Sequence, residues 1–147
     1  MGIVRLALLS GLVISLYACA PSIQSSIERP LLPTSGLPGA EISAGPPLKI
    51  VYPATAIYPA GSVLPDPRGL SHLEALATWL QGNSMANWQV RSWVESTDPT
   101  ATARAEKRRQ LLSRFFERKG LNVTRWDWQG GEPEGAQLSL TMVTDAP

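Results

Sequence analysis

The chain has 147 residues, with 13 Lys and Arg against 12 Asp and Glu, and a net charge of +1. A charge so close to zero argues against a nucleic-acid binder that works by neutralising phosphates. A single cysteine and a single histidine exclude a disulfide framework, a four-cysteine zinc site and histidine-rich metal ligation. We therefore expect no metal and no cofactor. The length allows one domain of ordinary size with a tail.

The N-terminal segment has the pattern of an export signal. Arg5 precedes an apolar run, LALLSGLVISLYA, over residues 6–18. Those thirteen residues span about 20 Å as a helix, which is shorter than the roughly 30 Å hydrocarbon core of a bilayer. A basic start followed by a short apolar run is typical of a secretory signal. We expect residues 1–18 to be a signal peptide rather than a membrane-spanning helix.

The end of this run, Leu16-Tyr17-Ala18-Cys19, resembles a bacterial lipobox. In such signals a peptidase cuts before the cysteine, whose thiol and new amine then carry acyl chains, with palmitate among them. The resemblance implies lipidation of Cys19, and several acyl chains anchor a protein stably because each buried CH₂ contributes about 0.8 kcal/mol. Ala20 follows the cysteine, where an aspartate would resemble an inner-membrane retention signal. The resemblance therefore implies the outer membrane, with the chain facing the periplasm.

A proline-rich segment follows the cysteine. Residues 20–47 contain six of the thirteen prolines and show no hydrophobic periodicity. Proline fixes φ and removes a backbone donor, so neither a helix nor an interior strand suits this stretch. We expect residues 19–47 to be the lipidated cysteine and a linker, and residues 48–147 to be one folded domain.

The first half of the domain predicts a strand, a helix and a second strand. The run LKIVYPATAIY, from Leu48, is rich in strand formers and is interrupted by Pro53. The segment Ser71-His72-Leu73-Glu74 resembles a capping box and predicts a helix from about 68–72 to 81. Apolar and polar residues then alternate over 88–95, which is typical of a half-buried strand.

The second half predicts a helix and two strands. Asp98-Pro99 is a good helix start, with an acceptor at the N-cap and proline at the first helical position. The helix extends to about Lys119 and ends at Gly120. Residues 122–128 and 137–143 predict the third and fourth strands. The resulting order is β-α-β-α-β-β, an α+β two-layer sandwich with a mixed four-stranded sheet and both helices on one face.

This order of elements, on an exported and anchored chain, resembles the OmpA C-terminal-like domain family, which includes peptidoglycan-associated lipoproteins. Arg108 stands twelve residues before Gly120, as the pattern arginine of the family stands before its helix-ending glycine. The other positions that carry the likeness are Gly61-Ser62-Val63-Leu64, Pro67-Arg68-Gly69, Val90 through Thr97-Asp98, Lys119-Gly120-Leu121, Gly130-Gly131-Glu132-Pro133 and the last strand, Gln137–Val143.

The resemblance implies a peptidoglycan site. In that family an Asp and an Arg hold diaminopimelate, which carries a carboxylate and an ammonium on one carbon. An Arg fork binds the carboxylate and an Asp accepts from the ammonium. By position the matching residues are Asp98 and Arg108, with Thr97 beside them. The implied function is an outer-membrane lipoprotein that binds peptidoglycan non-covalently and tethers the envelope.

Other interpretations of these residues stay open. Asp98 is also a good N-cap, and Arg108 could be an ordinary solvated arginine with a packed stem. The two residues are only ten apart, a shorter separation than the family keeps, and Glu95-Ser96 replaces its Gly-His. The alternative function is therefore a degenerate OmpA-like subunit of an envelope-spanning secretion or export machine, which contacts other envelope proteins. No Ser/His/Asp set, paired carboxylates or phosphate loop is visible, so we expect no enzyme.

The second predicted helix is strongly basic. Residues 104–119 carry seven Lys or Arg against Glu106 and Glu117. Such a run is usually a solvated helix face, but it could also meet an anionic glycan or lipid. Trp126 and Trp128 lie on one face of the predicted third strand, where they either pack in the core or stack on sugar rings.

Overall fold

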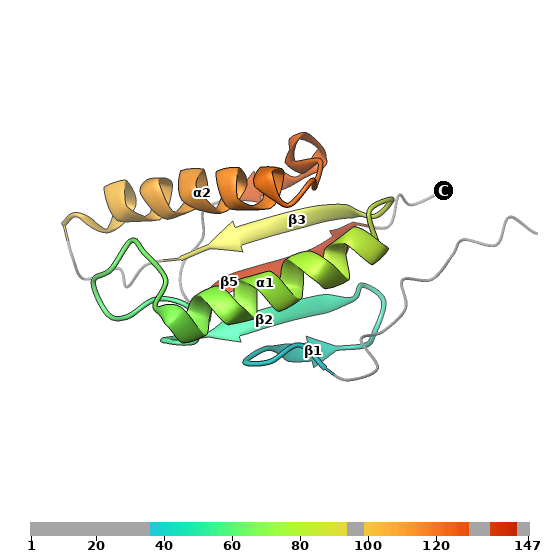
Figure 1. Ribbon diagram of the computed structural model, residues 1–147, viewed down its shortest axis with the longest axis horizontal. Helices are drawn as coiled ribbons and strands as arrows, with labels where there is room; N and C mark the ends of the chain where they lie inside the picture. Colours follow the sequence, from blue (N-terminus) through green and yellow to red (C-terminus); the bar gives the residue numbers. More distant parts are fainter. Residues whose placement is uncertain (1–35, 94–98, 130–135, 144–147) are drawn as a thin grey trace, which may run out of the picture.

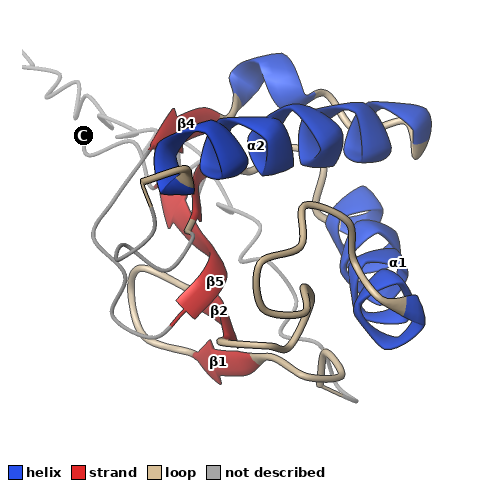
Figure 2. Cartoon of the chain, turned by 90° about the vertical axis from the view of Figure 1, so that its left-hand side faces the viewer, coloured by secondary structure: helices blue, strands red, loops and turns tan. Residues whose placement is uncertain are grey.

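The computed structural model describes residues 36–93, 99–129 and 136–143. In chain order its elements are β1 (Glu41–Ser43), β2 (Lys49–Pro53), α1 (Pro67–Gly82), β3 (Asn87–Ser92), α2 (Ala101–Arg118), the 3-10 helix η1 (Val123–Arg125), β4 (Asp127–Gln129) and β5 (Ala136–Val143). Figure 1 looks onto the helices with the sheet behind them. Figure 2, turned by 90°, shows both helices on the same side of the sheet. The predicted α+β sandwich is confirmed.

The sheet is mixed, as predicted, but it has five strands in the order β1-β2-β5-β3-β4, not four. β5 pairs antiparallel with β2 and β3, and β4 adds parallel to β3. The extra strand β1 falls in the predicted linker and pairs antiparallel with β2. Pro38, Pro46 and Pro47 flank this strand without interrupting it, while Leu37 is buried in the core. The linker prediction is therefore wrong over residues 36–47.

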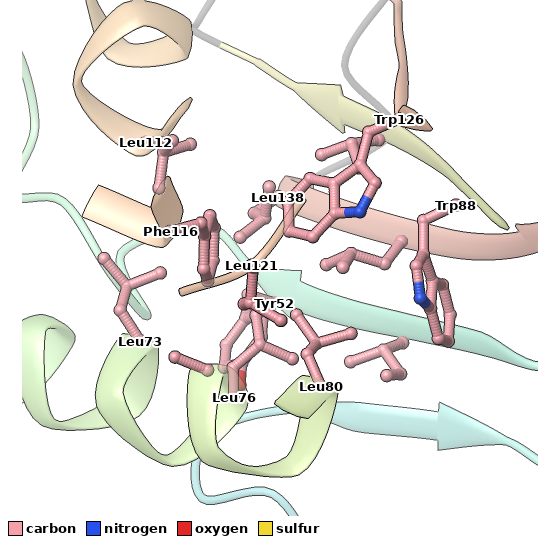
Figure 3. Close-up of a cluster of buried hydrophobic side chains, with 14 of the residues drawn as sticks. Tyr52, Leu73, Leu76, Leu80, Trp88, Leu112, Phe116, Leu121, Trp126 and Leu138 are labelled. Atoms are coloured by element: carbon pink, nitrogen blue, oxygen red, sulfur yellow. The ribbon is translucent and has the colours of Figure 1, made fainter. Parts of the chain in front are cut away.

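One core lies between the sheet and the two helices (Figure 3). Phe116 of α2 packs edge-on against Trp126, with ring centroids 5.1 Å apart, and Trp128 lies beside that indole. Both indoles therefore pack against the core cluster. The most deeply buried side chains include Leu73, Leu76 and Leu80 of α1, Leu112 and Phe116 of α2, Ile50 and Tyr52 of β2, Trp88 and Val90 of β3, and Leu138 and Leu140 of β5.

Helix α1 begins earlier than the capping-box pattern predicts. Asp66 is its N-cap, and a carboxylate oxygen accepts a hydrogen bond from the backbone N–H of Gly69 at 2.6 Å. Pro67 occupies the start of the helix, where its missing N–H costs nothing. Ser71 lies inside the helix and donates its hydroxyl to the carbonyl of Pro67. Asp66 and Pro67 thus supply the N-cap acceptor and the N-terminal proline that start the helix, several residues before Ser71.

Helix α2 ends where the sequence predicts but begins later. Gly120 has φ of 81°, and its N–H donates to the carbonyl of Glu117, while Leu121 N–H donates to the carbonyl of Phe116. This pair of bonds is a Schellman motif, which requires a left-handed residue and so favours glycine. At the other end the N-cap is Thr100, not Asp98, and Pro99 lies in the preceding turn. Asp98 itself lies outside the described residues.

The predicted third strand is only partly a strand. Asn122 accepts hydrogen bonds from the N–H and the hydroxyl of Thr124, which bends residues 123–125 into η1 before β4 begins. Local side-chain bonds of this kind compete with strand pairing. The prediction of a strand over 122–128 is therefore wrong for residues 122–126. In contrast, β3 and β5 overlap the strands predicted at 88–95 and 137–143.

In the part of the chain that the structure describes, neither α-helix combines the length and the apolar character needed to cross a membrane. The predicted signal peptide and Cys19 lie outside that part, so their roles stay predictions.

Candidate functional site

Arg108 of α2 is buried at the edge of the sheet where β3 ends. Its side chain is 3% exposed. The Nε and Nη2 atoms both donate to the carbonyl of Ser62, with Nε at 2.9 Å, and Nη1 donates to the carbonyl of Trp93 at 2.9 Å. Ser62 belongs to the loop between β2 and α1, and Trp93 directly follows β3. The guanidinium therefore joins three parts of the fold.

The positive charge of Arg108 also lies over an aromatic ring. The guanidinium carbon is 4.2 Å from the ring centroid of Tyr58, which is itself buried. Burial raises the pKa of the Tyr58 hydroxyl well above its usual range, and the nearby Arg108 charge offsets only part of that rise. Tyr58 is consequently neutral at physiological pH and presents a cation-binding π face.

The loop of residues 54–66 is fixed to the sheet by Gln137, the second residue of β5. The side-chain carbonyl of Gln137 accepts from the N–H groups of Ile57 and Tyr58 at 3.0 and 2.9 Å. Its amide NH₂ donates to the carbonyl of Tyr58 at 2.8 Å. One buried amide thus satisfies three buried backbone groups, and it holds Tyr58 under Arg108.

Replacing Gln137 by methionine is expected to lower the free energy of unfolding by about 2–4 kcal/mol, because it leaves three buried polar groups unpaired. Gln110→Met is the matched control, since Gln110 is exposed and its amide bonds only to Glu106. Urea unfolding followed by tryptophan fluorescence measures both. Equal losses for the two variants would contradict the role assigned to Gln137.

Among the residues that the structure describes, two buried polar atoms at the end of β3 have no hydrogen-bond partner. These are Ser92 Oγ and Trp93 Nε1. Successive side chains of a strand point to opposite faces of a sheet. Ser92 therefore points to the same face as Val90, which lies in the core, whereas Trp93 does not belong to the core cluster. The two atoms are therefore not one polar site.

The structure describes only one of the three residues that the sequence predicts to bind a ligand. Thr97 and Asp98 lie outside the described residues, so their predicted ligand roles stay predictions. Arg108 lies at the sheet end, whereas Arg109 is half-exposed and pairs with Glu106 at 2.6 Å.

The residues that contact Arg108 carry no recognisable signal in the sequence. Tyr58 and Gln137 are ordinary members of a strand-like run and of the last strand, and Ser62 and Trp93 contribute only main-chain carbonyls. A main-chain acceptor leaves no residue-type signal. The histidine, His72, contacts the carbonyl of Ala56 at 3.0 Å. In the described ranges no three His, Cys, Asp or Glu side chains gather in a way that could hold a metal ion.

Comparison with known proteins identifies the fold. No family model and no curated protein matches the chain. The periplasmic domain of Helicobacter pylori MotB aligns with 77% of this chain and 84% of its own length, at 14% identity and a TM-score of 0.60. The cell wall anchor of the T6SS from Pseudomonas aeruginosa aligns over 73% and 89%, at 11% identity and a TM-score of 0.56. The OmpA-like domain of FopA1 from Francisella tularensis aligns over 69% and 77%, at 11% identity and a TM-score of 0.50.

The described part of the chain therefore has the OmpA-like fold, divergent in sequence, as the resemblance implied. These similar structures are named as a periplasmic domain, an anchor and an OmpA-like domain, and none is named for a reaction.

Proposed function

We propose that this chain binds peptidoglycan non-covalently and ties the cell envelope to the cell wall. The observation that supports it best is the position of Arg108, a buried cation at one end of an OmpA-like sheet. One protein with a similar fold is described as a cell wall anchor. A ligand that carries both a carboxylate and an ammonium suits a site with one cation and one acid.

In this proposal Arg108, Asp98 and Thr97 act together on the diaminopimelate of the stem peptide. Arg108 holds the loop of residues 54–66 in shape and places positive charge at the sheet end. Asp98 accepts from the ligand ammonium, and Thr97 adds a hydroxyl beside it. The proposal further includes lipidation of Cys19, anchoring in the outer membrane and exposure of the domain to the periplasm.

Sedimentation with purified sacculi tests the proposal. Residues 20–147 contain every described residue and omit Cys19. We expect Asp98→Asn to reduce the bound fraction about tenfold, because a hydrogen bond to a charged group contributes about 1.5–3 kcal/mol. Thermal stability should not change, because the N-cap of α2 is Thr100 rather than Asp98. Asp127→Asn, at an exposed acid of β4, is the control with the same loss of charge. Equal binding by both variants, or none by the wild type, contradicts the proposal.

The alternative is a protein-docking subunit of an envelope-spanning machine. The observation that favours it is that three donor atoms of Arg108 already bond to main-chain carbonyls. In that case wild-type protein stays in solution with sacculi, while the full lipidated chain co-purifies with other envelope proteins. The sedimentation result therefore separates the two functions directly.

A further inference from the structure

Helix α2 carries three exposed cations on one line, which we name the basic stripe: Lys107, Arg114 and Arg118. Steps of seven and four residues return to nearly the same side of an α-helix. The stripe faces away from the core, since the buried residues of α2 are Arg108, Leu112 and Phe116. In Figure 1 this helix lies along the upper margin of the molecule.

The acids near the basic stripe bond elsewhere. Glu106 pairs with Arg109 at 2.6 Å, and the hydrogen bonds from Arg109 and Gln110 lower its pKa to about 2. Glu74 of α1 lies 3.4 Å from Lys119, and Glu117 accepts from the hydroxyl of Ser113. These contacts direct the nearby carboxylates to partners other than the basic stripe.

Within the described residues no side chain bonds or pairs with a cation of the basic stripe. Arg114 and Arg118 are also spaced i,i+4, an arrangement in which like charges repel and weaken a helix. Arg118 is favoured by the dipole at the helix C-terminus, but Lys107 and Arg114 lie too far from that end to gain from it. Helix stability alone thus gives no reason for the stripe.

The net charge of the chain shows which charges could attract it to an anionic surface. Without Arg5, the 13 basic residues become 12, equal to the 12 acidic residues. Attraction to a charged surface therefore cannot come from overall charge and must come from the local distribution. Cys19, the proposed lipid anchor, lies seventeen residues before Gly36, and seventeen residues reach at most roughly 60 Å. An anchor at Cys19 would therefore keep the domain near the bilayer.

We propose that the basic stripe docks this domain on the anionic phospholipid surface of a membrane. Lysine and arginine side chains near such a surface each contribute about 1 kcal/mol, or about fivefold in partition. The contact lays α2 along the bilayer. The proposed anchor at Cys19 supplies proximity, but the attraction itself does not depend on lipidation or on peptidoglycan binding.

The test uses residues 20–147 and vesicles of phosphatidylethanolamine with roughly 30% phosphatidylglycerol, which supplies an anionic surface. We expect the wild type to sediment with these vesicles at low salt and to be released at high salt, since screening weakens exposed charges. The variant K107Q/R114Q/R118Q is expected to bind roughly a hundredfold more weakly, at about fivefold for each cation. Vesicles without the anionic lipid should bind neither protein.

A matched variant, K49Q/R91Q/R125Q, removes three exposed cations outside α2 and the same total charge. It should bind like the wild type. Equal losses in both triple variants would show an effect of net charge alone and overturn the proposal, as would wild-type protein that ignores anionic vesicles. Sacculus binding should be unchanged in K107Q/R114Q/R118Q. If that variant loses sacculi and keeps vesicles, the stripe binds the cell wall instead, and the membrane proposal fails while peptidoglycan binding stands.

Discussion

Replacing Arg108 by methionine is expected to lower the free energy of unfolding by about 3–5 kcal/mol, the cost of removing one partner from a buried charged network. Methionine keeps most of the apolar stem but has no donors. The carbonyls of Ser62 and Trp93 then lose the bonds they accept from Arg108, and the Tyr58 ring loses its cation. Urea unfolding followed by tryptophan fluorescence measures the loss.

The neighbouring residue supplies the control. Arg109 is 41% exposed and pairs only with Glu106 on the helix surface. Exposed pairs of this kind contribute about 0–1 kcal/mol, so Arg109→Met should cost little. Arg108→Lys keeps the charge but cannot form the fork to two carbonyls, and it should fall between the two. If the three variants unfold at the same urea concentration, Arg108 does not join the loop, β3 and α2 as inferred.

Gly69→Ala is expected to lower the free energy of unfolding by about 3 kcal/mol or more, at the upper end of the cost of overpacking. Gly69 is buried in the first turn of α1, directly against the loop. A Cβ added there would lie 2.0 Å from the carbonyl oxygen of Ile57, and this atom belongs to the backbone, which Gln137 also holds. Neither the helix nor the loop can move without breaking one of these contacts.

The same helix contains an opposite case. A Cβ added at Gly82, the last residue of α1, would meet no atom within 4 Å. Alanine is a better helix former than glycine and restricts the unfolded chain, so Gly82→Ala should raise stability by up to about 1 kcal/mol. Thermal unfolding of the two single variants gives changes of opposite sign. A Gly69→Ala protein as stable as the wild type would mean that the loop does not pack on α1 as described.

Features set by neighbouring residues were predicted well from the sequence. The alternation of β3, the glycine at the end of α2 and the last strand all lie where expected. Each is encoded within a few residues, by side-chain period or by a cap. The predictions at Ser71 and Asn122 are wrong for the same local reason. A competing signal, Asp66-Pro67 in one case and the Asn122 side chain in the other, lies directly beside the predicted pattern.

The sequence by itself determined the fold class and the order of the helices and the three long strands. Only the tertiary structure decided that β1 completes the sheet and what Arg108 contacts. Ser62 and Trp93 lie 46 and 15 residues from Arg108, and Gln137 lies 80 residues from Ile57. Those contacts are made largely to main-chain atoms, which every residue has, so no pattern of side chains in the sequence could predict them. They form because folding leaves buried carbonyls and N–H groups that must be paired.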